Sequence, residues 1–112
     1  MYPIVSEADL AALFASPLAV LYKHSPICAT SGYAYEEMLA FRRQSRVPVF
    51  LVDVVHHRPL SRALAERTGV AHASPQAIIL RDGIPAWHRS HFDIQAEAVR
   101  SAVAMLEGGE RP

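Results

Sequence analysis

The stretch "LAVLYKHSPICATSGY", residues 18–33, decides the fold of this chain. It opens with five consecutive apolar residues, 18–22, which is the pattern of a strand covered on both faces. A polar, turn-like segment follows and leads to Cys28, the only cysteine in the sequence. From Cys28 to about Gln44 the apolar residues recur near helical spacing. The stretch therefore predicts a central strand, a turn and a helix, with the cysteine where the helix begins.

Further strands are predicted on the carboxyl side of this unit. The apolar runs at 47–54 and 76–81 predict two more buried strands. The Asp82-Gly83 pair predicts a tight turn into a fourth strand at 84–89, so the last two strands form a hairpin.

Helices are predicted between and around these strands. Ser6 and Asp9 resemble a capping box for a helix over 6–15. Pro59 suits the first turn of a helix that ends at Gly69. Asp93 is the predicted N-cap of a last, amphipathic helix. This element order predicts an α/β, thioredoxin-like fold: a central four-stranded mixed sheet flanked by helices, with an extra N-terminal helix, in one domain over residues 1–112.

Composition narrows the class of partner. The 112 residues include eleven basic and eleven acidic side chains, so no net charge favours nucleic acid or an anionic membrane. No apolar run approaches the roughly 20 residues that span a bilayer. A single cysteine cannot form an internal disulfide, which fits a reducing compartment. We therefore expect a cytoplasmic protein with protein or small-molecule partners.

Cys28 is the candidate nucleophile. An isolated cysteine is more often a small buried hydrophobe, but its polar flanks here favour a reactive thiol. The positive end of the following helix stabilises a thiolate, so we expect a lowered pKa. Ser31, one helical turn on, can donate its hydroxyl to the thiolate but cannot attack a disulfide. A mixed disulfide at Cys28 must then be resolved by a thiol from solution.

Two further sites are candidates. His24 is predicted to favour the thiolate as an imidazolium, although a surface-loop histidine fits equally well. Ser74 and Pro75 precede the third strand, where a thioredoxin-like layout predicts a cis Ser74-Pro75 bond and a Ser74 backbone free to pair with an extended substrate. The spacing of the histidines supplies no three or four converging ligands, so no metal site is predicted. Trp87 is expected in the core.

With these residues in place, the chain resembles the monothiol bacilliredoxins, the YtxJ-like thioredoxin-fold proteins of bacteria that use bacillithiol. The resemblance rests on "YKHSPICATS" (22–31), on "SPQAIILRDGIPAWHRSHFDI" (74–94) and on the element order. It implies a thiol-disulfide oxidoreductase that removes bacillithiol from S-bacillithiolated client proteins. Bacillithiol is then a co-substrate, and a separate reductase recycles bacillithiol disulfide; no tightly bound cofactor is expected.

On this resemblance Cys28 is the nucleophile, and Ser74 and Pro75 form the substrate-binding turn. We place Ser25, from the Lys-His-Ser run, beside them as a substrate-binding residue, and His24 and Ser31 beside Cys28 in the catalytic set. Two other functions remain open. A glutathione-linked monothiol redoxin would share the mechanism, and a non-enzymatic thioredoxin-like adaptor would bind protein partners without using Cys28.

Overall fold

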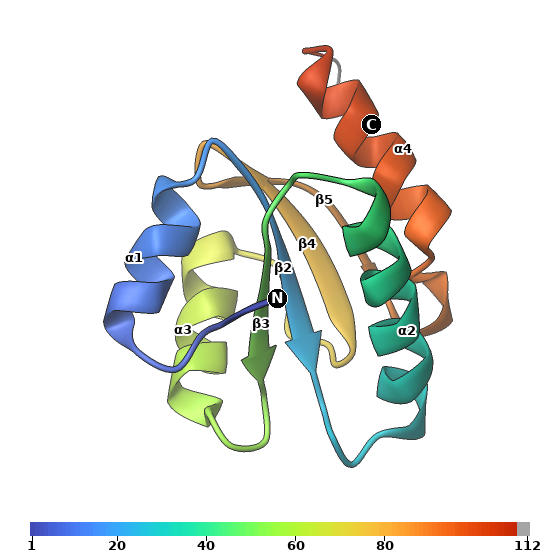
Figure 1. Cartoon of the computed structure of the whole chain (residues 1–112). Helices are drawn as coiled ribbons and strands as arrows, with labels where there is room; N and C mark the ends of the chain where they lie inside the picture. The colour runs from blue at the N-terminus through green and yellow to red at the C-terminus, as the bar shows by residue number, and fades with distance from the viewer. Residues whose placement is uncertain (110–112) are drawn as a thin grey trace.

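A computed structural model describes residues 1–109 of the chain (Figure 1). The elements follow in the order β1 (Tyr2–Pro3), α1 (Glu7–Ala15), β2 (Leu18–His24), α2 (Ala29–Gln44), β3 (Val49–Asp53), α3 (Arg58–Thr68), β4 (Gln76–Arg81), β5 (Ile84–Ser90), the 3-10 turn η1 (His91–Asp93) and α4 (Ala96–Glu107). The predicted order is confirmed for helices α1–α4 and strands β2–β5, whereas β1 and η1 were not predicted. The expectation of one domain over 1–112 stays a prediction, since residues 110–112 lie outside the described part.

The strands form one mixed sheet in the order β1-β3-β2-β4-β5. The first three are parallel, and β4 and β5 are each antiparallel to the strand before them in this order. The predicted thioredoxin-like architecture is confirmed, but the sheet has five strands where four were predicted. The extra strand is β1, two residues that pair with Phe50 and Leu51 at the open edge of β3.

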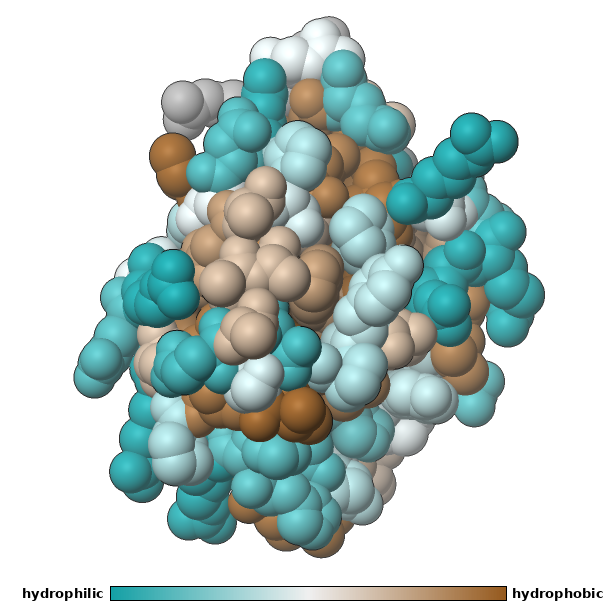
Figure 2. All heavy atoms as spheres, turned by 60° about the vertical axis from the view of Figure 1, so that its left-hand side comes forward, coloured by the Kyte–Doolittle hydropathy of each residue, from teal (hydrophilic) through white to brown (hydrophobic). Residues whose placement is uncertain are grey.

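Helices cover both faces of the sheet, α1 and α3 on one side and α2 and α4 on the other (Figure 1). Side chains of β2 alternate between the two resulting cores. Val20 and Tyr22 pack toward α2 and α4, whereas Ala19 and Leu21 pack toward α1 and α3. This double burial explains the uninterrupted apolar run of β2. On the outer face that carries α1, hydrophilic residues surround a more apolar centre (Figure 2).

The helix ends are mostly as predicted. Ser6 and Asp9 form a reciprocal capping box at the start of α1, and Gly69 ends α3 in the left-handed region. The prediction for Asp93 was wrong, because this residue closes η1 and α4 begins at Ala96 with Gln95 as N-cap. A distant carboxylate takes its place: the Ala96 N–H donates to Glu37 Oε1 on α2 at 3.0 Å.

The β4–β5 hairpin is fixed to the end of α1. Asp82 and Gly83 both have positive φ, as a tight two-residue turn requires. The Asp82 N–H donates to the Pro17 carbonyl at 2.9 Å. A Cβ at Gly83 would lie 2.9 Å from the Phe14 carbonyl oxygen, so this position needs glycine for space as well as for conformation.

Candidate active site

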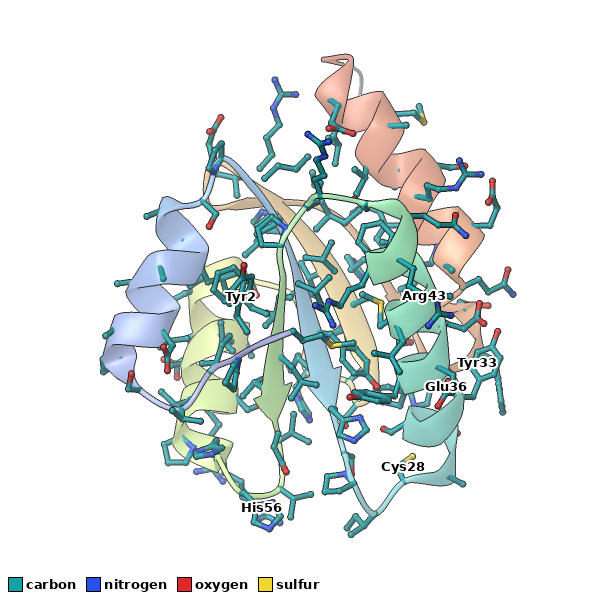
Figure 3. All side chains as sticks on the ribbon, viewed as in Figure 1. Tyr2, Cys28, Tyr33, Glu36, Arg43 and His56 are labelled. Carbon is teal, nitrogen blue, oxygen red and sulfur yellow. The ribbon has the colours of Figure 1, made fainter. Side chains whose placement is uncertain are left out.

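Cys28 is the N-cap residue of α2, just beyond the carboxyl end of β2 (Figure 3). It is half-buried and is the only cysteine of the chain. Its thiol makes no capping hydrogen bond, and the Ser31 N–H donates to the Cys28 carbonyl at 3.0 Å. The start of α2 is the positive end of the helix dipole, which favours a negative sulfur. The cysteine thus lies where the sequence predicted it, at a helix terminus that favours an anion.

The electrostatics of the helix start lower the pKa of the Cys28 thiol. The nearby Ser31 backbone N–H is the largest cause, and the Thr30 N–H is the next. Partial desolvation opposes these, and the two hydroxyls add smaller lowering effects. These groups raise the thiolate fraction at neutral pH, which is the nucleophilic form of cysteine.

Ser31 is fully buried beneath the Cys28 loop. The backbone N–H of Ser25 donates to the Ser31 hydroxyl at 3.2 Å, and the Cys28 N–H donates to the Ser25 carbonyl at 3.2 Å. Ser25 and Ser31 therefore close the loop that presents Cys28. The structure places both near the thiol, with Ser25 as part of the loop scaffold.

His24 lies at the end of β2 in an aromatic cluster. Its Nδ1 is 2.9 Å from the Tyr22 hydroxyl, and its ring centroid is 5.4 Å from that of Tyr35. Burial lowers the pKa of His24, and the charge of Asp53 opposes this only in part. The neutral imidazole is thus favoured over the imidazolium that was predicted from the sequence.

Sequence reasoning missed the part played by Tyr22. Its hydroxyl donates to the Ser31 carbonyl at 3.1 Å while it contacts His24, and so it joins two predicted site residues from below. The signal was a tyrosine in a buried strand, because a buried tyrosine hydroxyl nearly always needs a partner. The partner of this hydroxyl, the carbonyl of Ser31 nine residues later, could be identified only from the folded structure.

Ser74 and Pro75 precede β4, the antiparallel neighbour of β2. The Ser74-Pro75 bond is cis, as predicted. The Pro75 carbonyl accepts from the His91 N–H at 3.1 Å, whereas no backbone hydrogen bond within residues 1–109 engages Ser74. The Ser74 hydroxyl is buried without a partner in the same part of the chain.

Two aromatic side chains near the site differ in exposure. Trp87 is buried, as predicted, and Phe92 is exposed and packs edge-on against Tyr33 at 5.4 Å between centroids.

In the described part of the chain no three His, Cys, Asp or Glu side chains converge as a metal site would require. Within residues 1–109 no helix is long and apolar enough to cross a membrane.

Comparisons with known proteins agree with the thioredoxin-like fold and with a single reactive cysteine. The family model described as "Monothiol bacilliredoxin BrxC" matches residues 3–99. A solved structure described as a candidate oxidoreductase with a thioredoxin fold is 27% identical, with a TM-score of 0.83, over 89% of this chain and 90% of its own.

Two thioredoxins are more distant in sequence. Thioredoxin from Fasciola hepatica is 18% identical, with a TM-score of 0.74, over 93% of this chain and 97% of its own. A variant thioredoxin from Halobacterium salinarum is 12% identical, with a TM-score of 0.72, over 89% and 84%. At these identities the two thioredoxins show a shared fold.

Proposed function

Because the chain belongs to the monothiol bacilliredoxin family, we propose that it removes bacillithiol from S-bacillithiolated proteins through a mixed disulfide at Cys28. The observation that carries this proposal is the placement of Cys28 at the start of α2, where backbone N–H groups lower its pKa. Ser31 three residues later offers a hydroxyl and no second thiol. Such a site can accept one cap and must return it to an external thiol.

The reaction is two successive thiol-disulfide exchanges. The Cys28 thiolate attacks the bacillithiol sulfur of the client mixed disulfide, the client S–S bond breaks, and the client cysteine leaves as a thiolate. Cys28 then holds bacillithiol in a new disulfide. A free bacillithiol thiolate attacks the bacillithiol sulfur of this adduct and forms bacillithiol disulfide, while Cys28 returns to its thiolate. The oxidising equivalents end in bacillithiol disulfide, for a separate reductase.

A protein client is supported by the surface around the thiol. Ile27, directly before Cys28, is 83% exposed, and Phe92 is 64% exposed. Large apolar side chains left in solvent are typical of contact surfaces for other proteins. The unpaired Ser74 backbone offers main-chain groups to an extended client segment, as in β-augmentation. We expect this exchange to take place in the cytoplasm.

The test uses a model protein with a single cysteine capped by bacillithiol. Without added thiol, the wild type is expected to take up one equivalent of the cap, seen as one bacillithiol mass on the intact chain. Free bacillithiol is expected to make the reaction catalytic. Cys28→Ser is expected to fold with an unchanged far-UV spectrum and to take up no cap.

Two arms of this test address the other candidate functions. Equal turnover of a glutathione-capped substrate with free glutathione would identify a glutathione-linked redoxin instead. Absence of any cap on Cys28, together with client binding that survives Cys28→Ser, would replace the oxidoreductase with an adaptor.

A further inference from the structure

A cavity of about 520 Å³ lies beside α3, at the sheet edge that also carries Cys28. Its walls come from the β3–α3 loop, the first three turns of α3 and His72 in the segment before β4. His56, in the same loop, and Cys28 lie at one edge of the molecule (Figure 3). The carboxyl ends of parallel strands are where open α/β sheets hold ligands.

The charge of the cavity wall suits an anion. Two arginines, Arg58 and Arg62, line it against a single carboxylate, that of Glu66, and His72 adds a neutral imidazole that can hydrogen-bond an anion. Neither arginine takes part in an ion pair within residues 1–109. The wall also contains the positive N-terminal end of α3, whose N-cap side chain makes no hydrogen bond. Val54, Val55 and Ala65 add apolar surface, so the cavity fits a small molecule with both anionic and aliphatic parts.

A buried lysine lies next to this wall. Lys23 is the only lysine in the sequence, is fully buried on the α3 side of β2, and its Nζ has no hydrogen-bond partner within residues 1–109. Gln76, its cross-strand neighbour, has an equally buried and unpartnered Oε1. Gln76 donates from Nε2 to the carbonyl of Ala71, the residue before His72, at 3.1 Å. The charge of Lys23 also helps, after burial, to lower the pKa of His72. Unpaired buried charges are costly, and this one adds to the positive field at the cavity.

The cavity and the thiol are connected through one segment of chain. His72 is two residues before Ser74, and Ser74-Pro75 leads into β4, the direct neighbour of β2. We propose that this cavity binds the carboxylate end of the small thiol whose sulfur becomes disulfide-bonded to Cys28. The proposal rests on the proposed function and adds a binding site for the anionic end of the co-substrate, lined by Arg58, Arg62 and His72.

The kinetic test compares two symmetrical disulfides, that of mercaptosuccinate, a dicarboxylate, and that of thioglycerol, which is neutral. In each reaction the Cys28 thiolate attacks one sulfur, forms the Cys28 mixed disulfide and releases one thiolate. The mass of the intact protein reports the adduct.

The double variant Arg58→Gln/Arg62→Gln is expected to lower the mercaptosuccinate rate on the order of ten-fold more than the thioglycerol rate. The matched control is Arg42→Gln/Arg43→Gln, which removes the same charge at the far end of α2 and is expected to leave the rate ratio unchanged. An unchanged ratio in the α3 variant, or an equal change in the control, would overturn the proposal.

A second readout needs no reaction at Cys28. With isotope-labelled lysine, Cys28→Ser gives one side-chain signal, that of Lys23. Succinate is expected to shift this signal saturably, and the Arg58→Gln/Arg62→Gln exchange is expected to abolish the shift. No saturable shift in the parent would sink the cavity proposal whatever the kinetics show. Should the wild type react with neither disulfide, the proposed function fails while the lysine signal still decides the cavity.

Discussion

The backbone N–H of Ser25 donates a 3.2 Å hydrogen bond to the hydroxyl of Ser31, and both residues are buried. Ser31 holds the place that a second thiol has in two-cysteine motifs, and its oxygen ties the loop that presents Cys28. Sulfur is a weak acceptor, so a thiol would serve this contact less well than a hydroxyl. The serine therefore has a structural task of its own beside the nucleophile.

Removing this hydroxyl is expected to cost stability and thiol acidity together. Ser31→Ala leaves the Ser25 N–H buried without a partner, so we expect the free energy of unfolding to fall by about 1–3 kcal/mol. The Ser31 hydroxyl also helps to lower the pKa of Cys28, so this pKa should rise. Urea unfolding and the pH dependence of iodoacetamide alkylation measure the two effects. Ser101→Ala, on the exposed side of α4, is the control, and equal behaviour of both variants would contradict the argument.

A thiol at position 31 is expected to release the cap from Cys28 without an external thiol. In Ser31→Cys, the new thiol lies one turn from the Cys28 mixed disulfide and can displace its cap to form an internal disulfide. Mass spectrometry of the capped variant without added thiol should show that the cap is lost. The product should be two hydrogens lighter than the reduced chain, as one internal disulfide requires. Ser45→Cys, at the other end of α2, should keep the cap. A stable cap on Ser31→Cys would show that the two positions cannot approach.

Tyr22 is expected to set the protonation pattern of His24. Its single hydroxyl proton goes to the Ser31 carbonyl, so the oxygen accepts from His24, which places the imidazole proton on Nδ1. Nitrogen NMR should show protonated Nδ1 in the wild type and its loss in Tyr22→Phe, with about 1 kcal/mol less stability. Tyr33→Phe, at the surface, is the control and should change neither. An unchanged His24 spectrum in Tyr22→Phe would refute this assignment.

Lys23 is expected to make the protein less stable at neutral pH than at high pH. Burial lowers its pKa from 10.5 to about 8. Between these values the unfolded chain binds more protons than the folded one, so unfolding becomes harder as pH rises through this window. Below it the penalty is complete, at about 3 kcal/mol. Lys23→Met should therefore be more stable than the wild type at pH 7.

The measurement is urea unfolding of both proteins at several pH values. The stability advantage of Lys23→Met is expected to shrink from pH 8 to pH 10.5, because the wild-type amine loses its charge in both states. If the stability difference between the two proteins stayed constant across this range, burial would not disfavour the charged form of Lys23 in the folded protein.

Much of the fold could be predicted because local patterns decide it. The apolar run of β2, the Asp82-Gly83 turn and the Ser6-Asp9 capping box each depend on residues close in sequence. Two-residue β1 could not be predicted in this way, because its pairing depends on the free edge of β3. The start of α4 depends on Glu37, 59 residues away, and so Asp93 was a reasonable but wrong choice.

The site divides in the same manner. Cys28 at a helix start and the cis Ser74-Pro75 bond could be inferred from motif and element order. The contacts of Tyr22 and Lys23 could not, because each depends on which face of β2 a side chain occupies and on which loop covers it.

The packing at Gly83 and the nucleophile Cys28 lie at opposite ends of β2. The contact of this glycine with the Phe14 carbonyl lies at the end of the sheet where Leu18 pairs with Arg81, whereas Cys28 follows the opposite end at His24. A bulkier residue at 83 would strain the joint between hairpin and α1 and leave the nucleophile's surroundings intact. Selection for durability and selection for reactivity can therefore act on opposite ends of one strand, and each can change without a compromise at the other.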